Sequence, residues 1–255
     1  MPNRAPLDLS QLSLRSLPGR GADRAYVVGG SGSGKSELAD QLGFDWDRRY
    51  WNKKGKRLIL DRKPRYKAQW NINGTKATRR YKNWDHGPLV YGSVLVEEPR
   101  DLEMAWKLGY HVAVCQGDSD SDIPRMLAVA EEYHKRARAS QPQLLQVDEC
   151  LLFFGPTGQP KGGNDILKTY VIAGRERGVA SIFCSQRTKG LPPSIMEELN
   201  RLYLFRLDYK DDFKRLQEMG APVEMEDVPT EEHEFMYWTK ASYRDLWGPY
   251  KLDLG

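Results

Sequence analysis

One eight-residue stretch restricts the possible folds of this 255-residue chain more than any other feature. The short apolar run Arg24–Val28 leads into it, and helix-forming residues continue from it to about residue 42. The stretch fits the pattern G-x-x-x-x-G-K-[ST], in which glycines let consecutive backbone N–H groups converge on phosphate oxygens. A flexible Gly/Ser loop is the alternative, but the order strand, glycine-rich turn and helix favours a phosphate-binding loop. Its members are Gly29, Gly30, Ser31, Gly32, Ser33, Gly34, Lys35 and Ser36.

The last two residues of this loop predict its ligands. Lys35 is expected to reach the β- and γ-phosphates of a nucleotide, and the hydroxyl of Ser36 is expected to bind Mg²⁺. ATP and Mg²⁺ are therefore the expected cofactors.

A pair of carboxylates follows the apolar residues 144–147. Asp148 and Glu149 stand where a phosphate-binding enzyme needs one carboxylate to organise Mg²⁺ and another to activate water. Their order predicts that Asp148 faces the metal and that Glu149 is the general base. A strand end that simply meets solvent is the alternative interpretation.

Three further side chains have weaker signals. Gln186 follows the apolar residues 179–184, and we expect it to contact the γ-phosphate or the attacking water, although a solvated amide is an alternative. Arg175 and Arg177 end the helical stretch before that run. One of them is expected to enter the site of a neighbouring subunit as an arginine finger, and the alternative is a cation that complements the end of the helix.

Apolar runs alternate with helical stretches along the chain, which predicts an α/β fold with a mainly parallel sheet flanked by helices. Residues 1–22 are expected to form an N-terminal arm outside the core, 23–207 the core and 208–255 a C-terminal extension packed on it. The expected strands are 24–28, 57–60, 89–96, 111–116, 144–147, 179–184, 202–207 and 234–239, and the expected helices are 36–42, 100–108, 123–139, 166–177 and 192–200. The glycine-rich loop 155–164, with Lys161, is either a moving element that faces a nucleic-acid channel or an ordinary surface loop.

Positive charge is concentrated in one segment. Residues 44–91 hold fourteen Lys or Arg against four Asp or Glu, whereas the rest of the chain holds 25 and 31. The same segment carries nine aromatic residues, a mixture suited to phosphate backbones and base faces. It is interpreted as a basic, aromatic insertion in exposed loops or a hairpin, with a turn at residues 72–75, that contacts DNA or a portal or membrane partner.

The cysteines and the hydropathy argue against a disulfide-stabilised, a cysteine–metal or a membrane-spanning protein. Cys115, Cys150 and Cys184 lie in or beside apolar runs without metal-ligand spacing, so we expect buried thiols rather than disulfides. No apolar stretch approaches the length that crosses a bilayer, so no transmembrane segment is expected.

The order of these motifs resembles that of the HerA/FtsK-type P-loop ATPases, especially the genome-packaging ATPases of tailless, membrane-containing icosahedral viruses. The resemblance covers about residues 24–207, and only the phosphate-binding loop is strongly specific by itself. The matching stretches are residues 26–36, 57–63, 145–149, 174–179, 181–187, 191–193 and 204–207.

The resemblance implies a RecA-like, additional-strand fold, with the catalytic Glu strand inserted between the P-loop strand and its neighbour. It also implies a homo-oligomeric ring, pentameric or hexameric, around a nucleic-acid channel. Lys35 and Ser36 would then bind nucleotide and Mg²⁺, while Asp148 coordinates the metal and Glu149 activates water. Gln186 would sense the nucleotide state, and an arginine of residues 174–178 would act in trans.

The leading hypothesis is an ATP-driven translocase that packages viral double-stranded DNA into a preformed capsid. Its expected location is the host cytoplasm or the packaging vertex of the virion, with a capsid vertex or membrane-associated portal protein as a partner. The alternatives are a cellular DNA-pumping ATPase of the same type, a small-molecule P-loop kinase, and a non-catalytic nucleotide-gated DNA-binding protein.

Overall fold

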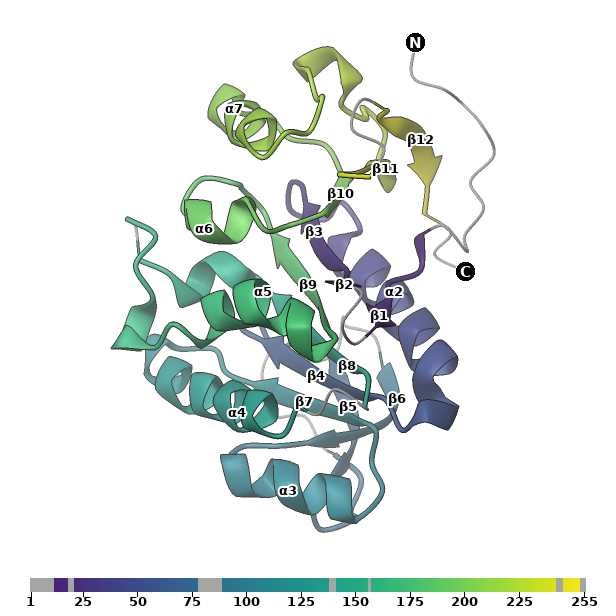
Figure 1. Cartoon of the computed structure of the whole chain (residues 1–255), viewed down its shortest axis with the longest axis vertical. Helices are drawn as coiled ribbons and strands as arrows, with labels where there is room; N and C mark the ends of the chain where they lie inside the picture. The colour runs from purple at the N-terminus through teal and green to yellow at the C-terminus, as the bar shows by residue number, and fades with distance from the viewer. Residues whose placement is uncertain are drawn as a thin grey trace.

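A ten-stranded sheet organises the chain (Figure 1), in a computed structural model that describes residues 12–17, 21–77, 89–137, 141–155, 157–241 and 245–252. Eight neighbouring strands are parallel, and two antiparallel strands complete one edge. In spatial order they are β12 (Trp247–Lys251), β11 (Glu234–Thr239), β10 (Arg201–Leu204), β3 (Arg24–Val28), β9 (Val179–Ser185), β8 (Gln143–Asp148), β4 (Lys56–Asp61), β7 (Val112–Gln116), β6 (Leu89–Leu95) and β5 (Lys67–Asn71). The predicted parallel α/β architecture is confirmed.

Helices cover both faces of the sheet (Figure 1). One face is covered by α2 (Lys35–Tyr50), and the other by α3 (Pro99–Lys107), α4 (Ile123–Lys135) and α5 (Ile166–Arg177). The remaining elements are α6 (Pro193–Met196), α7 (Lys210–Glu218), the 3₁₀ turns η1 (Trp51–Lys53), η3 (Asp120–Asp122), η4 (Cys150–Phe153), η5 (Lys161–Gly163) and η6 (Met225–Asp227), and the small strand pair β1 (Ser16–Leu17) and β2 (Gly21–Ala22).

Side chains of each central strand alternate between these two layers. In β3, Tyr26 and Val28 pack in the cluster that contains α4 and α5, whereas Ala25 and Val27 pack with α2. This is the period of two that a strand buried on both faces requires. All three cysteines are buried and free, as expected. No helix in the described ranges combines the length and the apolar character needed to cross a bilayer.

The first helix is longer than the sequence pattern predicts. It continues eight residues beyond position 42 because Leu38, Leu42, Trp46 and Tyr50 recur at a spacing of four and bury one stripe against the sheet. Trp46, Tyr50 and, beyond the helix, Tyr66 are therefore core residues rather than exposed rings.

A buried arginine fastens α2 to the sheet. Arg57 in β4 is 1% exposed and reaches Asp40 at 3.0 Å and Asp47 at 2.9 Å, both on α2. The guanidinium passes directly beneath Gly43, where a built Cβ would lie 2.1 Å from the guanidinium carbon. A glycine inside a helix costs about 1 kcal/mol relative to alanine, and here it makes room for the ion pairs.

The order of strands corrects one expectation. The strand between the P-loop strand β3 and the carboxylate strand β8 is β9, which ends before Gln186. The strand that carries Glu149 therefore lies one position further from the P-loop strand than expected. Parallel pairing of β3 with β9, and of β9 with β8, establishes this arrangement.

Parts of the basic segment and of the N-terminal arm also differ from expectation. The described parts of 44–91 form the end of α2, β4, β5 and the start of β6, so they belong to the sheet and its cover, although the predicted turn is present where Gly74 N–H donates to the Asn71 carbonyl at 2.9 Å. Tyr81 and Trp84 lie outside the described residues. Leu12 and Leu14 are buried against the α2 layer, so the expectation of an arm off the core is wrong for these two residues.

Candidate active site

Four parallel strands place polar residues at the edge of the sheet formed by their carboxyl ends. Val28 pairs with Ser185 and Asp61 pairs with Asp148, so β3, β9, β8 and β4 all end at this edge. The phosphate-binding loop, Gln186, the two carboxylates and the segment after β4 are therefore neighbours. Carboxyl ends of parallel strands are the usual location of ligand sites in α/β sheets.

The loop between β3 and α2 has the geometry of a phosphate cradle. Gly29 has no space for a side chain, because a built Cβ would lie 2.4 Å from the Cβ of Phe205. Gly34 has a φ of 98° and precedes α2, and no described side chain caps that helix N-terminus. Its first N–H groups are thus available to an anion, which the helix dipole also favours.

Lys35 is held close to this loop. Its Nζ donates a hydrogen bond to the carbonyl of Gly30 at 2.6 Å, and the residue is 6% exposed. Burial lowers the pKa of Lys35, and the charge of Glu149 opposes that shift. Lys35 therefore lies beside both the loop and the carboxylate pair.

Ser36 and Asp148 form a partial cation site. The Ser36 hydroxyl donates to Asp148 Oδ1 at 3.3 Å, while Oδ2 is buried without a partner among the described residues. Burial, followed by the charges of Asp61 and Glu149, raises the pKa of Asp148 to about 7. A divalent cation would satisfy the orphaned oxygen, and Mg²⁺ commonly uses one or two protein oxygens beside substrate phosphates and water. The residues therefore fit Mg²⁺.

Glu149 is held in an unusual backbone conformation. Its φ and ψ are both 49°, in the left-handed region that non-glycine residues seldom occupy and that is often found at functional sites. One carboxylate oxygen, Oε1, accepts from Lys63 Nζ at 3.0 Å and from Gln186 Nε2 at 2.7 Å. The structure thus brings together Glu149 and Gln186, which are 37 residues apart in sequence.

The segment after β4 supplies site residues that none of the sequence motifs predicts. Arg65 Nη1 donates to the Ser36 hydroxyl at 3.3 Å, and the Tyr66 hydroxyl donates to the Ser36 carbonyl at 3.1 Å. Buried Asp61 accepts from the backbone N–H groups of Arg65 and Tyr66 at 2.6 and 2.8 Å. The available signal was an apolar strand that ends in Asp61, the same pattern that identified Asp148.

A second buried carboxylate organises the loop after Gln186. Asp212 on α7 is 0% exposed and accepts from Arg187 Nε at 2.7 Å, from Thr188 N–H at 2.9 Å and from the Thr188 hydroxyl at 2.8 Å. The Arg187 guanidinium also lies 3.7 Å from the centre of the Tyr209 ring. Residues beyond 207 therefore contact the segment that carries Gln186.

The predicted arginine fingers lie away from the site of their own chain. Arg177 ends α5 at the edge where β9 begins, and its Nη1 donates to the His134 carbonyl at 3.3 Å. The rise along β9 separates this edge from the site by about 20 Å. The backbone of Arg175 lies in the same last turn, and its side chain is outside the described residues. Neither arginine can act on the nucleotide of its own subunit, so action in trans stays a prediction.

The loop that carries Lys161 is tied to the site through one acidic residue. Lys161 Nζ lies 2.9 Å from Asp120, and Arg62 Nη2 lies 3.2 Å from the same carboxylate. Arg62 is the chain neighbour of Lys63, which contacts Glu149. Two charged contacts of Asp120, the chain link between Arg62 and Lys63, and the contact of Lys63 with Glu149 therefore connect Glu149 to this loop.

A cavity of about 280 Å³ adjoins the outer side of the phosphate loop. Carboxylates accept hydrogen bonds from ribose hydroxyls and from an amino group but repel phosphate. The cavity therefore suits the nucleoside part of a nucleotide. It is lined by residues 30–33, Arg206, Asp208, Thr230, Glu231, Glu232 and Glu234.

Comparison with known proteins supports the fold. No protein-family model matches the chain, and no curated protein matches it by sequence. The structure resembles the genome-packaging NTPase B204 of Sulfolobus turreted icosahedral virus 2 in complex with AMPPCP, with a TM-score of 0.59, 16% identity and coverage of 89% of this chain and 98% of that chain. It also resembles B204, the DNA-packaging ATPase of Sulfolobus turreted icosahedral virus, with a TM-score of 0.60, 14% identity and coverage of 89% and 98%.

A third similar structure comes from a longer protein. ATPases 2 and 3 of EssC from Geobacillus thermodenitrificans match with a TM-score of 0.52 and 14% identity over 85% of this chain and 37% of that chain. The resemblance inferred from the motifs is thus confirmed at the level of fold, which is that of P-loop ATPases.

Proposed function

We propose that this protein hydrolyses ATP and uses the energy to move double-stranded DNA, in the manner of a motor that packages a viral genome into a preformed capsid. The observation that carries the proposal is Glu149, held in a left-handed backbone conformation beside the Ser36–Asp148 pair and contacted by Gln186. A simple phosphate-binding protein has no need of a second, separately restrained carboxylate at that position.

Each site residue has a role that follows from its contacts. The N–H groups at the start of α2 and the Lys35 ammonium would hold the β- and γ-phosphates, while Ser36 and Asp148 would hold Mg²⁺. When bound, Mg²⁺ neutralises charge on the phosphates. Glu149 takes a proton from the attacking water, and Gln186 positions that carboxylate. Because Lys63 and Gln186 occupy the same Glu149 oxygen, release of one of these contacts is expected to accompany activation.

Movement is proposed to pass to the loop that carries Lys161. A shift of Lys63 would move its chain neighbour Arg62 and then, through the contacts of Asp120, Lys161. The load is duplex DNA, bound through phosphate contacts that carry no sequence information.

The proposed assembly is a homo-oligomeric ring of five or six subunits. Arg175 and Arg177 lie at the edge of the sheet opposite the nucleotide site, so only a neighbouring subunit can bring one of them to a transferring phosphate. The ring would act in the host cytoplasm at a capsid vertex or a membrane-associated portal.

An ATPase assay with and without duplex DNA tests this function. Hydrolysis should be stimulated by DNA and abolished in Lys35→Ala, whereas Glu149→Gln should still bind ATP. Activity that is lost in Arg175→Ala or Arg177→Ala and restored by mixing with Lys35→Ala would identify the arginine that acts in trans. Phosphate transfer to a small acceptor without any effect of DNA would contradict the proposal.

The proposed coupling has its own test. Asp120→Asn should keep ATP hydrolysis but lower DNA movement per ATP, because it removes the charge that links Arg62 to Lys161. Asp118→Asn is a matched control on the same loop, since Asp118 is exposed and its backbone N–H, not its carboxylate, makes the contact to Asp122. Equal effects of the two substitutions would exclude the coupling path.

A further inference from the structure

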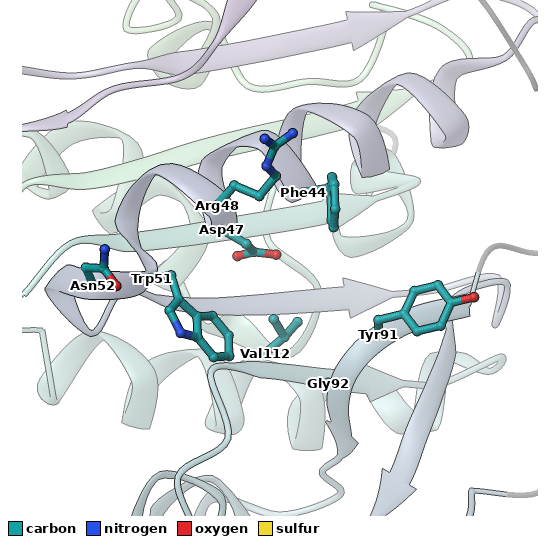
Figure 2. A pocket seen from close by; sticks show the side chains of 8 residues that line it. All are labelled: Phe44, Asp47, Arg48, Trp51, Asn52, Tyr91, Gly92 and Val112. Atoms are coloured by element: carbon teal, nitrogen blue, oxygen red, sulfur yellow. The ribbon is translucent and has the colours of Figure 1, made fainter.

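An aromatic cleft lies at the end of α2 remote from the phosphate-binding loop. The cavity has a volume of about 520 Å³. Figure 2 shows Phe44 and Asp47 on α2 and Trp51 just beyond the helix, with Tyr91 and Gly92 on β6 across the opening and Val112 at the base. The cleft thus lies between the end of α2 and strand β6 (Figure 1).

Large apolar rings are exposed at this cleft. Phe44 is 53% exposed, Trp51 is 56% exposed and Tyr91 is 73% exposed, in contrast to the buried Trp46 and Tyr50 of the same helix. An isolated exposed ring is common, but three rings that border one cavity are a surface with an energetic reason to bind something.

Trp51 is prearranged as a stacking platform. One face of its indole packs on the His111 ring, with centroids 4.1 Å apart and an interplanar angle of 30°. His111 is fixed by a contact of its Nδ1 with the Gly55 carbonyl at 3.0 Å. The indole therefore loses little freedom when a second planar group stacks on its open face, which favours affinity.

Four cations without a described acidic partner lie along the last turn of α2 and just beyond it, and Arg48 lines the cavity itself. Arg48, Arg49, Lys53 and Lys54 are all exposed, and none of them forms an ion pair with a described residue. The negative charge of Asp47 in the cleft is offset by Arg57 at 2.9 Å. Aromatic faces beside cations are the combination that binds unpaired bases together with their phosphates.

We propose that this cleft binds a short stretch of single-stranded nucleic acid, with bases stacked on Trp51, Phe44 and Tyr91 and phosphates near Arg48 and Lys53. Intact duplex DNA fits less well, because its bases are already stacked and only its backbone could use the cations. A protein ligand would have to supply acidic groups for four cations that have no described acidic partner. The inference goes beyond the proposed motor function, because this binding needs no ATP.

Binding of a fluorescein-labelled dT₁₅ oligonucleotide to the full-length chain, followed by fluorescence anisotropy without nucleotide, tests this site. Trp51→Ala with Tyr91→Ala should weaken binding roughly tenfold or more, because each stacked base contributes about 1–3 kcal/mol. Arg48→Ala with Lys53→Ala should reduce the slope of log affinity against log salt by about 1.4, since each phosphate contact to a single strand contributes about 0.7.

Controls separate this site from other surfaces. Lys210→Ala with Lys214→Ala removes the same charge from exposed positions of α7 and should leave oligonucleotide binding unchanged. The aromatic double variant should keep wild-type ATPase activity and wild-type affinity for a blunt hairpin duplex, so failure of the cleft proposal is distinguishable from failure of the motor proposal. Wild-type affinity of the aromatic variant for dT₁₅ would overturn the inference. A change of its oligomeric state in sedimentation would instead assign the cleft to contacts between copies.

Discussion

Asp212→Ala should both destabilise the protein and slow ATP hydrolysis, because Asp212 fixes the loop that follows Gln186. Both carboxylate oxygens are occupied, Oδ2 by Arg187 and Oδ1 by Thr188 and Lys189. Since the residue is fully buried, water cannot replace the carboxylate without local rearrangement.

The size of the effect follows from the groups left without a partner. The Thr188 N–H would become unsatisfied, at about 1–3 kcal/mol, whereas the Thr188 hydroxyl would keep the backbone carbonyl of residue 212 at 3.1 Å. With the lost contact to Arg187, the free energy of unfolding should fall by roughly 2–4 kcal/mol. For a domain of this size this corresponds to a Tm lower by roughly 10 °C. Asp212→Asn keeps one acceptor for Thr188, but its amide NH₂ would replace the oxygen that accepts from Arg187. Because the Arg187 side chain is 36% exposed, water can take over that contact, and the substitution should cost about 1 kcal/mol.

Urea unfolding gives the stabilities, and steady-state ATPase kinetics at a temperature where all variants are folded give the catalytic effect. The alanine variant should lose kcat more than KM, because the loop positions Gln186 rather than binding the nucleotide. Asp211→Ala is the matched control, since its side chain is 72% exposed, and it should change stability by less than about 0.5 kcal/mol. If the alanine and asparagine variants of Asp212 were equally stable, or if kcat were unchanged in both, the positioning role would be refuted.

Three further predictions concern separate parts of the molecule. Glu149→Gln should lower kcat by at least about 100-fold while nucleotide affinity, measured by calorimetry, stays within a few-fold of wild type; comparable turnover would exclude Glu149 as the base. Lys63→Met should raise ATP hydrolysis without DNA roughly fivefold, because it removes from Glu149 Oε1 a charge-assisted contact worth about 1 kcal/mol after allowance for its exposure and leaves Gln186 as the donor to that oxygen; a lower basal rate would show instead that Lys63 supports catalysis. Burial raises the pKa of Asp47 to about 6 against the effect of Arg57, so ionisation of Asp47 destabilises the folded state as pH rises from about 4 to 6. Across that window the stability of Asp47→Asn relative to wild type should increase by about 3 kcal/mol in urea unfolding, and a decrease would contradict the assigned shift.

The strand ends of the active site could be predicted because their signals are local. A glycine-rich turn after β3, two carboxylates after β8 and an amide after β9 each stand directly behind an apolar run, and parallel strands necessarily bring such ends together. The hydrogen bond from Gln186 to Glu149 shows that two of these strand ends meet. The position of β9 between the two other strands was not predictable from spacing, because sequence order does not determine the order of strands in a sheet.

The remaining site residues could not be predicted because their roles depend on distant partners. Lys63 is one of many basic residues in its segment, and only its contact with Glu149 distinguishes it. Asp212 stands in no motif, and only the packing of α7 brings it to Thr188. The aromatic residues of the same basic segment include both core and surface residues: Trp46 lies in the core, whereas Trp51 lies at the surface.

Because the Arg57 side chain passes beneath Gly43, the residues at these two positions should change together in evolution. Any side chain at position 43 would displace the guanidinium and leave Asp40 and Asp47 facing each other without a cation. Conversely, a shorter residue at position 57 would remove the reason for a glycine in the middle of α2. Related sequences should therefore exchange these two residues together, and an isolated replacement at either position should be rare.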